Sequence, residues 1–256
     1  MASDPVTTKV ISWKFPRTLT STVVIGDSQV RHIHNHFDAS RHGTPAFVSQ
    51  RGATIQDIPA LMDFVPRTTT TIVLHVGTND IAKTPARVTS QRFEKLLVSI
   101  RHDHPQTRTV YATLILPRCP NRRRQRSNGR AVHRFNSEAC PFNDLLRRHC
   151  LRTRGLYYLD HGLEWLPSAR VFAAEEIHPN FDGVAITASH LHRALLRNFA
   201  RSQSTWLQHA ASAPSQQVQG KAPPPPPPPP TAAALSSEAP STRPRYSDVV
   251  RGPRRD

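Results

Sequence analysis

The stretch from Val23 to Val30 constrains the fold more than any other part of the sequence. Three β-branched residues, Val23 to Ile25, lead into the corner Gly26-Asp27-Ser28, and a helical pattern begins directly after it. This order is typical of a buried parallel strand that runs into an amphipathic helix. Ser28 is then expected at the carboxyl edge of the sheet, where open α/β sheets bind ligands and a helix N-terminus favours negative charge. The stretch alone permits two interpretations: a nucleophilic serine, or a turn in which Ser28 caps the helix.

Strand and helix patterns alternate about five times over the first 200 residues. Further strands are expected at 46–48, 70–76, 108–116 and 156–159, and helices at 29–37, 54–65, 88–100, 139–151 and 186–199. Such alternation predicts an α/β protein, a three-layer α/β/α sandwich with a central, mostly parallel five-stranded sheet. Residues 1–20 are polar and unpatterned, which predicts a flexible N-terminal arm before a folded domain at 21–200.

Residues 201–256 cannot supply a core. Their apolar residues are mostly Ala and Val, and the uninterrupted run Pro223–Pro230 is expected to form extended polyproline II. The composition predicts a disordered, basic, proline-rich tail. SH3-type or WW-type domains that recognise such runs are candidate partners of Pro223–Pro230.

A strong positive charge indicates polyanionic partners. The formal net charge is +16 with neutral histidines, which favours nucleic acid first and an acidic membrane surface second, against a merely soluble basic protein. The segment 118–134 breaks the helical pattern and carries Arg122, Arg123, Arg124 and Arg126. These arginines predict either a phosphate-binding edge that contacts the backbone of single-stranded RNA or a solvated surface.

No sequence pattern predicts a metal or another cofactor. The histidines His32, His34 and His36 alternate and do not share one helical face, so the pattern favours surface or groove residues over metal ligands. The three cysteines lack zinc spacing and a C-x-x-C pair, which favours a reducing compartment. Residues 1–15 do not resemble a signal peptide, and no apolar run reaches the ~20 residues of a membrane span. We therefore expect an intracellular protein, cytoplasmic or nuclear.

Four motifs in order carry a resemblance to a known family. Strand ends present Ser28, Gly52 and Asn79, and a loop with His178 precedes the closing helix. In this order the chain resembles the SGNH (GDSL-type) hydrolases over about residues 23–199. The blocks that match the family pattern are Gly26-Asp27-Ser28, Gly52, Gly77-Thr78-Asn79-Asp80 and Glu175-Glu176-Ile177-His178-Pro179.

The resemblance implies a serine esterase that hydrolyses a short acyl or acetyl ester. Ser28 would be the nucleophile and His178 its base, and the backbone N–H groups of Ser28 and Gly52 with the Asn79 amide would form the oxyanion hole. The acid of the family is an aspartate, whereas the matching residue here is Glu175. Glu176 or a backbone carbonyl is the alternative partner of the imidazole.

The motif wording and the basic, proline-rich tail look most like one branch of the family. This branch occurs in first open reading frame proteins of LINE-type retroelements, beside nucleic-acid-binding segments. The alternative function is accordingly an RNA-binding module on the same fold, with weak or absent catalysis.

Overall fold

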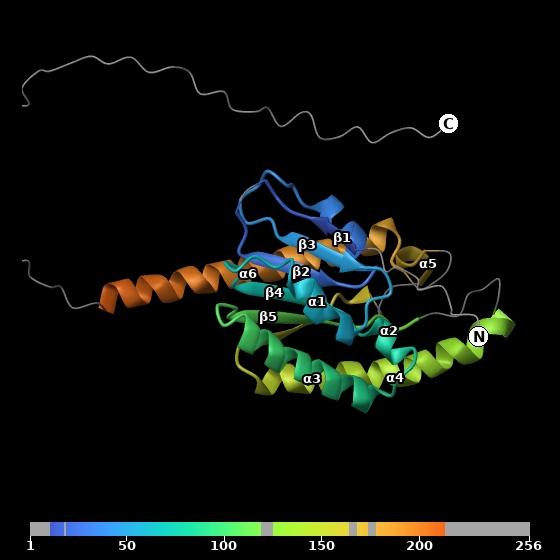
Figure 1. Cartoon of the computed structure of the whole chain (residues 1–256). Helices are drawn as coiled ribbons and strands as arrows, with labels where there is room; N and C mark the ends of the chain where they lie inside the picture. The colour runs from blue at the N-terminus through green and yellow to red at the C-terminus, as the bar shows by residue number, and fades with distance from the viewer. Residues whose placement is uncertain (1–10, 18, 119–124, 164–167, 174–177, 213–256) are drawn as a thin grey trace, which may run out of the picture. The chain divides into compact units, whose positions relative to one another are not determined.

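A six-stranded sheet forms the centre of the chain. The computed structural model describes residues 11–17, 19–118, 125–163, 168–173 and 178–212 (Figure 1). The strand order is β1-β3-β2-β4-β5-β6, and β2 to β6 are parallel neighbours. The strands are β1 (Ile11–Lys14), β2 (Thr22–Gly26), β3 (Ala46–Gln50), β4 (Thr71–His75), β5 (Thr109–Thr113) and β6 (Leu156–Leu159).

Helices cover both faces of this sheet, and together with it they form three layers. They are η1 (Val30–His36), η2 (Ile55–Asp57), α1 (Ile58–Met62), α2 (Thr78–Ile81), α3 (Ala86–Asp103), α4 (Gln125–Arg152), α5 (Ser168–Val171) and α6 (Phe181–Ser212). The predicted fold class, a mostly parallel α/β sandwich, is confirmed. Among the described residues, no helix has both the length and the apolar character needed to cross a membrane.

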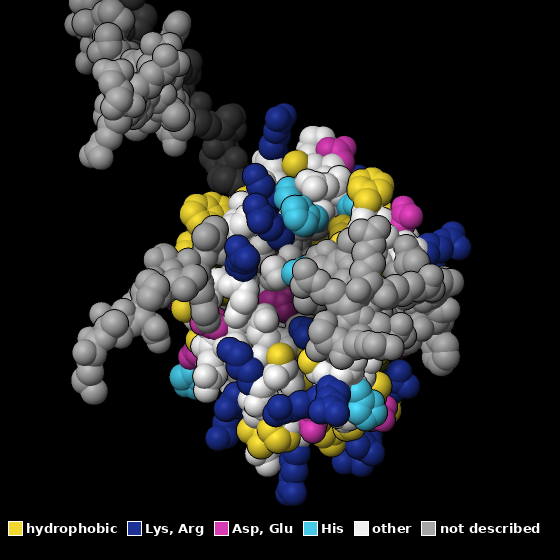
Figure 2. Space-filling view, turned by 90° about the vertical axis from the view of Figure 1, so that its right-hand side faces the viewer, with side chains coloured by type: hydrophobic (Ala, Val, Ile, Leu, Met, Phe, Trp, Pro, Cys, Tyr) yellow, Lys and Arg dark blue, Asp and Glu magenta, His cyan; other side chains and the backbone are white. Residues whose placement is uncertain are grey.

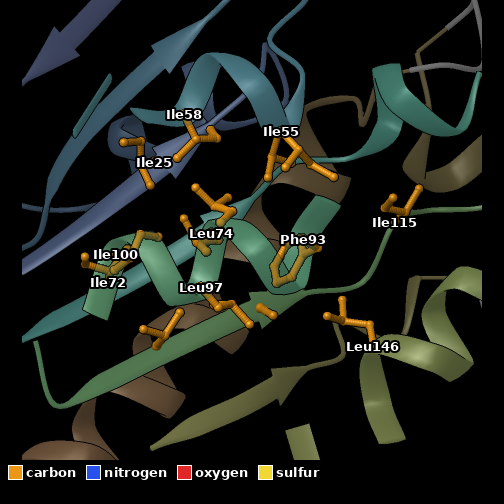
Figure 3. Packing of buried hydrophobic residues seen from close by; sticks show 14 of the residues in the cluster. Ile25, Ile55, Ile58, Ile72, Leu74, Phe93, Leu97, Ile100, Ile115 and Leu146 are labelled. Carbon is orange, nitrogen blue, oxygen red and sulfur yellow. The ribbon is translucent and has the colours of Figure 1, made fainter. Parts of the chain in front are cut away.

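The alternation of side chains along the strands builds a separate core on each face. Val23 and Ile25 of β2 pack with α1, α3 and α4 on one face (Figure 3), whereas Val24 packs with η1 and α6 on the other. Successive side chains of a strand point to opposite faces, so a sheet buried on both sides needs continuous apolar runs. The run from Val23 to Ile25 meets this requirement.

The predicted sheet lacked one strand. Ile11–Lys14 forms β1 and pairs antiparallel with β3, so the sheet has six strands instead of five, and these residues are not part of a flexible arm. Trp13 stacks on Phe64 with the ring centroids 5.5 Å apart. Strand β1 is a partly exposed edge strand of four residues, with polar Ser12 and Lys14. Its alternation of apolar and polar residues is too short to predict a strand from the sequence.

Two helices are longer than their patterns predict. Helix α4 begins at Gln125 rather than near 139, and the buried residues Val132 and Phe135 extend its apolar stripe back by about two turns. Helix α6 continues to Ser212, since residues 200–212 contain neither Pro nor Gly. The unit that contains the sheet and its helices ends at Ala211. Residues 213–256 lie outside the described residues, so the disordered tail stays a prediction.

Candidate active site

Ser28 lies at the carboxyl edge of the sheet, in the turn between β2 and η1. The chain passes from β2 to β3 on one side and later returns to β4 on the other side of β2, and ligands of open α/β sheets bind at such a switch point. The turn packs tightly on β4. A Cβ atom on Gly26 would lie 2.0 Å from the carbonyl oxygen of His75, so only glycine fits here. The N–H of Asp27 donates to that same oxygen at 3.1 Å.

His178 contacts Ser28 from the loop before α6. The Oγ atom of Ser28 and the Nε2 atom of His178 are hydrogen-bonded at 3.0 Å, across 150 residues of sequence. Backbone bonds close the loop on both sides of the histidine: the N–H of Ala173 donates to the His178 carbonyl, and the N–H of Asn180 donates to the Val171 carbonyl, each at 2.9 Å. A hydroxyl next to a fixed imidazole nitrogen can transfer its proton to that nitrogen.

The residue before the serine is a buried acid. The Asp27 side chain is 1% exposed, and its Oδ1 atom accepts a hydrogen bond from the N–H of Gln29 at 2.9 Å. Burial raises the pKa of Asp27 to about 7, against a smaller lowering by that N–H. Within the described residues its Oδ2 atom has no hydrogen-bond partner. The Asp27 side chain therefore belongs to the interior, behind the turn that presents Ser28.

Gly52 and Asn79 follow the carboxyl ends of β3 and β4, at the same edge of the sheet as Ser28. Gly52 follows β3 with φ +69°, a left-handed conformation that favours glycine. Asn79 lies in α2, directly after β4, and its Nδ2 atom donates to the carbonyl of Ala53 at 2.9 Å. An amide group has two N–H donors, and the bond to Ala53 uses one of them.

Several predicted site residues lie outside the described residues. These are Glu175, Glu176, Arg122, Arg123 and Arg124. Arg126 lies in the first turn of α4, and its side chain is not described either. The acid of the triad and the arginine patch therefore stay predictions.

The histidines of η1 show no arrangement of metal ligands. His34 is hydrogen-bonded through Nδ1 to the backbone oxygen of Arg31 at 2.8 Å. The described residues contain no group of three or more His, Cys, Asp or Glu side chains placed to hold a metal ion.

The sequence reasoning missed a buried polar chain behind Ser28. His75, at the end of β4, is hydrogen-bonded through Nε2 to Oε1 of Gln29 at 2.8 Å and through Nδ1 to Oγ1 of Thr113 at 2.6 Å. Burial lowers the pKa of His75 to about 4, so this ring is neutral at pH 7. The signal in the sequence is a histidine that directly follows the apolar run Ile72–Leu74 at the end of a buried strand. Such a residue must find polar partners when it is buried.

Only the comparison with solved structures supports the fold. No protein-family model matches the sequence, and no curated protein matches it either. Among solved structures, one similar protein is provisionally named a platelet activating factor, from Streptococcus pneumonia. It is 19% identical with a TM-score of 0.54, over 70% of this chain and 85% of that chain.

Two further structures carry names of lipolytic proteins. A member of the lipolytic G-D-S-L family from Veillonella parvula DSM 2008 is 16% identical, with a TM-score of 0.50 over 70% of this chain and 100% of that chain. A lipase from a goat rumen metagenome is 14% identical, with a TM-score of 0.50 over 70% of this chain and 97% of that chain. At these identities the likeness concerns the fold, and the chain has the fold of the SGNH (GDSL-type) hydrolases, as its motifs predict.

Proposed function

We propose that the chain is a serine esterase of the SGNH type that hydrolyses a short acyl or acetyl ester. The observation that carries this proposal is the 3.0 Å hydrogen bond between Ser28 Oγ and His178 Nε2, at the edge where this fold binds ligands. A serine hydroxyl is a poor nucleophile until a neighbouring base accepts its proton.

In the proposed reaction, Ser28 Oγ attacks the ester carbonyl while His178 accepts the hydroxyl proton. The tetrahedral intermediate carries a negative oxygen, which the N–H groups of Ser28 and Gly52 and the second N–H of Asn79 stabilise. His178 then gives its proton to the leaving alkoxide. Water, activated by the same imidazole, hydrolyses the acyl-enzyme and restores Ser28.

The imidazole also needs a partner that orients it. We assign this role to Glu175, three residues before His178. Glutamate serves in other serine triads, although its extra methylene places the carboxylate differently from the aspartate of the family. Glu176 or a backbone carbonyl is the alternative.

Labelling with a fluorophosphonate probe and hydrolysis of 4-nitrophenyl acetate test the proposal. Ser28→Ala should lose labelling, and Ser28→Ala and His178→Ala should each lower hydrolysis about 10³-fold or more, because members of a triad act as a unit. The matched control is Ser189→Ala, which alters an exposed serine of α6 and should label like the wild type. Equal hydrolysis by the wild type and Ser28→Ala would contradict the assignment.

A second candidate function is binding of single-stranded nucleic acid, and a surface groove favours it. The groove, of about 640 Å³, lies where the end of α4 meets the edge strand β6, and Arg147, Arg152, Arg154 and Tyr157 contribute to its lining. Arginines can bind the phosphate backbone of a nucleic acid, and an aromatic ring beside them can stack on its bases. The net charge of the whole chain, +16, is also positive and would attract the same polyanion.

Filter binding of single-stranded RNA over a salt series tests this second function. Arg147→Gln, Arg152→Gln and Arg154→Gln should each reduce the log–log salt slope by about 0.7. Arg67→Gln is the control, because Arg67 is exposed and does not line the groove. A flat salt response in the wild type would remove this function. The retroelement branch and the reader of Pro223–Pro230 stay predictions.

A further inference from the structure

A partly buried arginine lies at the same sheet edge as Ser28, and the esterase reaction described above does not use it. Arg118 follows β5, and its backbone is held by one side chain of α4. The N–H of Arg118 donates to Oδ1 of Asn136 at 2.8 Å, and Nδ2 of Asn136 donates to the Arg118 carbonyl at 2.6 Å. These two bonds fix the point from which the arginine side chain extends.

The guanidinium group of Arg118 is oriented by an aromatic ring, and the described residues give it no ion pair. It lies over the ring of Phe135, 3.8 Å from the centroid, and Phe135 itself is buried. Stacking holds the plane of the guanidinium and leaves its N–H edges for a planar anion. The Nε atom is buried without a hydrogen-bond partner among the described residues.

Removing a cation from water without a counter-charge is unfavourable. Burial accordingly lowers the pKa of Arg118. Arg92 offers a comparison, because this partly buried arginine lies 3.6 Å from the Asp80 carboxylate. No such ion pair of Arg118 occurs in the described part of the chain. The charge of Asp27 offsets part of this lowering, and an anion that reached Arg118 would supply a counter-charge in direct contact with the guanidinium.

The position of Arg118 places this charge near the nucleophile. Two strand spacings separate β2 from β5 in the strand order, which is about 10 Å across the sheet. Burial raises the pKa of Asp27, and the Arg118 charge opposes a small part of this rise, so Arg118 lies within electrostatic range of the residue that directly precedes Ser28. Figure 2 views the molecule from the side on which α2 and α5 lie in Figure 1, and Lys and Arg side chains are spread over the described part of this surface.

We propose that Arg118 binds an anionic group, a carboxylate or a phosphate, of the ester whose carbonyl Ser28 attacks. The inference rests on the proposed esterase function and names its substrate class. A guanidinium binds both anions through paired N–H···O bonds. The anionic group would lie within about 10 Å of the carbonyl carbon, the span between the two strands. Neutral esters are then the poorer substrates.

Pairs of esters that differ in one charge test the substrate class. The first pair is 4-nitrophenyl hemisuccinate and its neutral methyl ester, which places the charge on the acyl side. The second is 3-acetoxybenzoate and its methyl ester, which places it on the alcohol side. In at least one pair, the wild type should prefer the anionic ester. Arg118→Gln should lower the anionic-to-neutral ratio of kcat/KM about 10- to 100-fold, the effect of losing a charged hydrogen bond. Arg118→Lys should retain part of the preference, because it keeps the charge but loses the paired donors.

A control variant and a binding measurement distinguish the anion-binding role of Arg118 from the esterase activity of Ser28. Arg67→Gln removes one exposed charge elsewhere and should leave the ratio within about twofold, as expected for a screened surface charge. If hydrolysis depends on Ser28 but the ratio is the same in Arg118→Gln and the wild type for both pairs, Arg118 is a solvated cation and the esterase proposal stands.

If no ester is hydrolysed, calorimetry with succinamate, a non-ester that carries the same carboxylate, decides the anion site. Binding that is lost in Arg118→Gln retains the site without the reaction, and equal binding by both proteins removes it. Orthophosphate in the same titration reports whether phosphate is also bound.

Discussion

The side-chain amide of Asn79 donates a hydrogen bond to the backbone carbonyl of Ala53, 2.9 Å away, and so joins α2, which follows β4, to the loop after β3. The next residue strengthens this link, because Oδ2 of Asp80 accepts the N–H of Ile55 at 2.9 Å. Gly52 and Asn79, the two proposed oxyanion donors outside the serine turn, therefore lie on segments that are bonded to each other. Donors held in this way need no reorganisation when charge develops on the substrate.

Replacing Asn79 should lower the turnover of 4-nitrophenyl acetate. Asn79→Ala removes one oxyanion donor and is expected to reduce kcat about 10²- to 10³-fold. Asn79→Asp should reduce it at least as far, because a carboxylate repels the oxyanion. The control is Asn35→Ala, which alters an exposed side chain of η1. A kcat of Asn79→Ala within threefold of the wild type would remove Asn79 from the oxyanion hole.

The parts of the fold that the sequence predicts are those in which one local pattern decides the structure. The helix expected from residue 54 begins at a capping box of Thr54 and Asp57, whose two partners lie within one turn. The run from Val23 to Ile25 is apolar without interruption, because both faces of this strand are buried. By contrast, β1 depends on pairing with β3 and packing of Trp13 on Phe64. Such long-range contacts leave almost no local trace.

In the candidate site, too, residues within local motifs could be predicted from the sequence, whereas residues placed by long-range contacts could not. The motif order indicates Ser28 and His178, and their hydrogen bond spans 150 residues. In the sequence, Arg118 stands only at the start of a segment without a helical pattern. Its role could not be predicted, because its position depends on contacts with Asn136 and Phe135 of α4. The sequence predicted that helix to begin only after both residues, and no local pattern relates them to position 118.

Single replacements of the two glutamates should identify the partner of His178. Glu175→Gln is expected to lower kcat/KM for 4-nitrophenyl acetate about 10²-fold or more, because an imidazole without its carboxylate loses its orientation and the stabilisation of its protonated form. Glu176→Gln, the matched control beside it, should change the rate less than threefold. The reverse order would assign the role to Glu176. Full activity of both variants and of the double variant would leave a backbone carbonyl or a distant residue.

Gly26→Ala should destabilise the whole domain. An added Cβ atom would lie 2.0 Å from the His75 carbonyl oxygen, and backbone atoms of a central strand cannot move away without loss of sheet hydrogen bonds. We expect a loss of about 3 kcal/mol or more in the free energy of unfolding, at or beyond the upper end for overpacked cores. Gly129→Ala is the control, since no atom lies within 4 Å of the added carbon and alanine favours the helix by up to about 1 kcal/mol. Urea denaturation of both variants measures the difference, and equal midpoints would contradict the close packing of β2 on β4.

His161 should make the folded state sensitive to acid. The side chain is 2% exposed, and neither ring nitrogen has a hydrogen-bond partner among the described residues. The centroid of its ring is 6.2 Å from that of His75 and 6.4 Å from that of His190. Burial lowers the pKa of His161 to about 3, with smaller contributions from these two histidines. The folded state therefore holds His161 neutral, whereas the unfolded chain binds a proton near pH 6.5.

The sign of the pH dependence follows from linkage. A histidine whose pKa is lower in the folded state contributes stability that is fully present above about pH 6.5 and declines as the pH falls toward its folded value. His75, with a folded pKa of about 4, acts in the same direction. Asp27 acts in the opposite direction, because its pKa is raised to about 7 and its contribution is lost as the pH rises from about 4 to 7. A variant that changes only one of these groups is needed to separate their contributions to the pH dependence of stability.

His161→Phe is that variant, because it keeps a ring of similar size and removes two unpartnered nitrogens. We expect it to raise the free energy of unfolding at pH 7 by about 1–2 kcal/mol, the order of the penalty for a buried unsatisfied polar group. Its Tm should fall less than that of the wild type between pH 6.5 and pH 4. His133→Phe, at an exposed position of α4, should follow the wild-type curve. Thermal unfolding followed by circular dichroism across this range decides the matter: parallel curves for His161→Phe and the wild type would show that the His161 ring does not take part in acid unfolding.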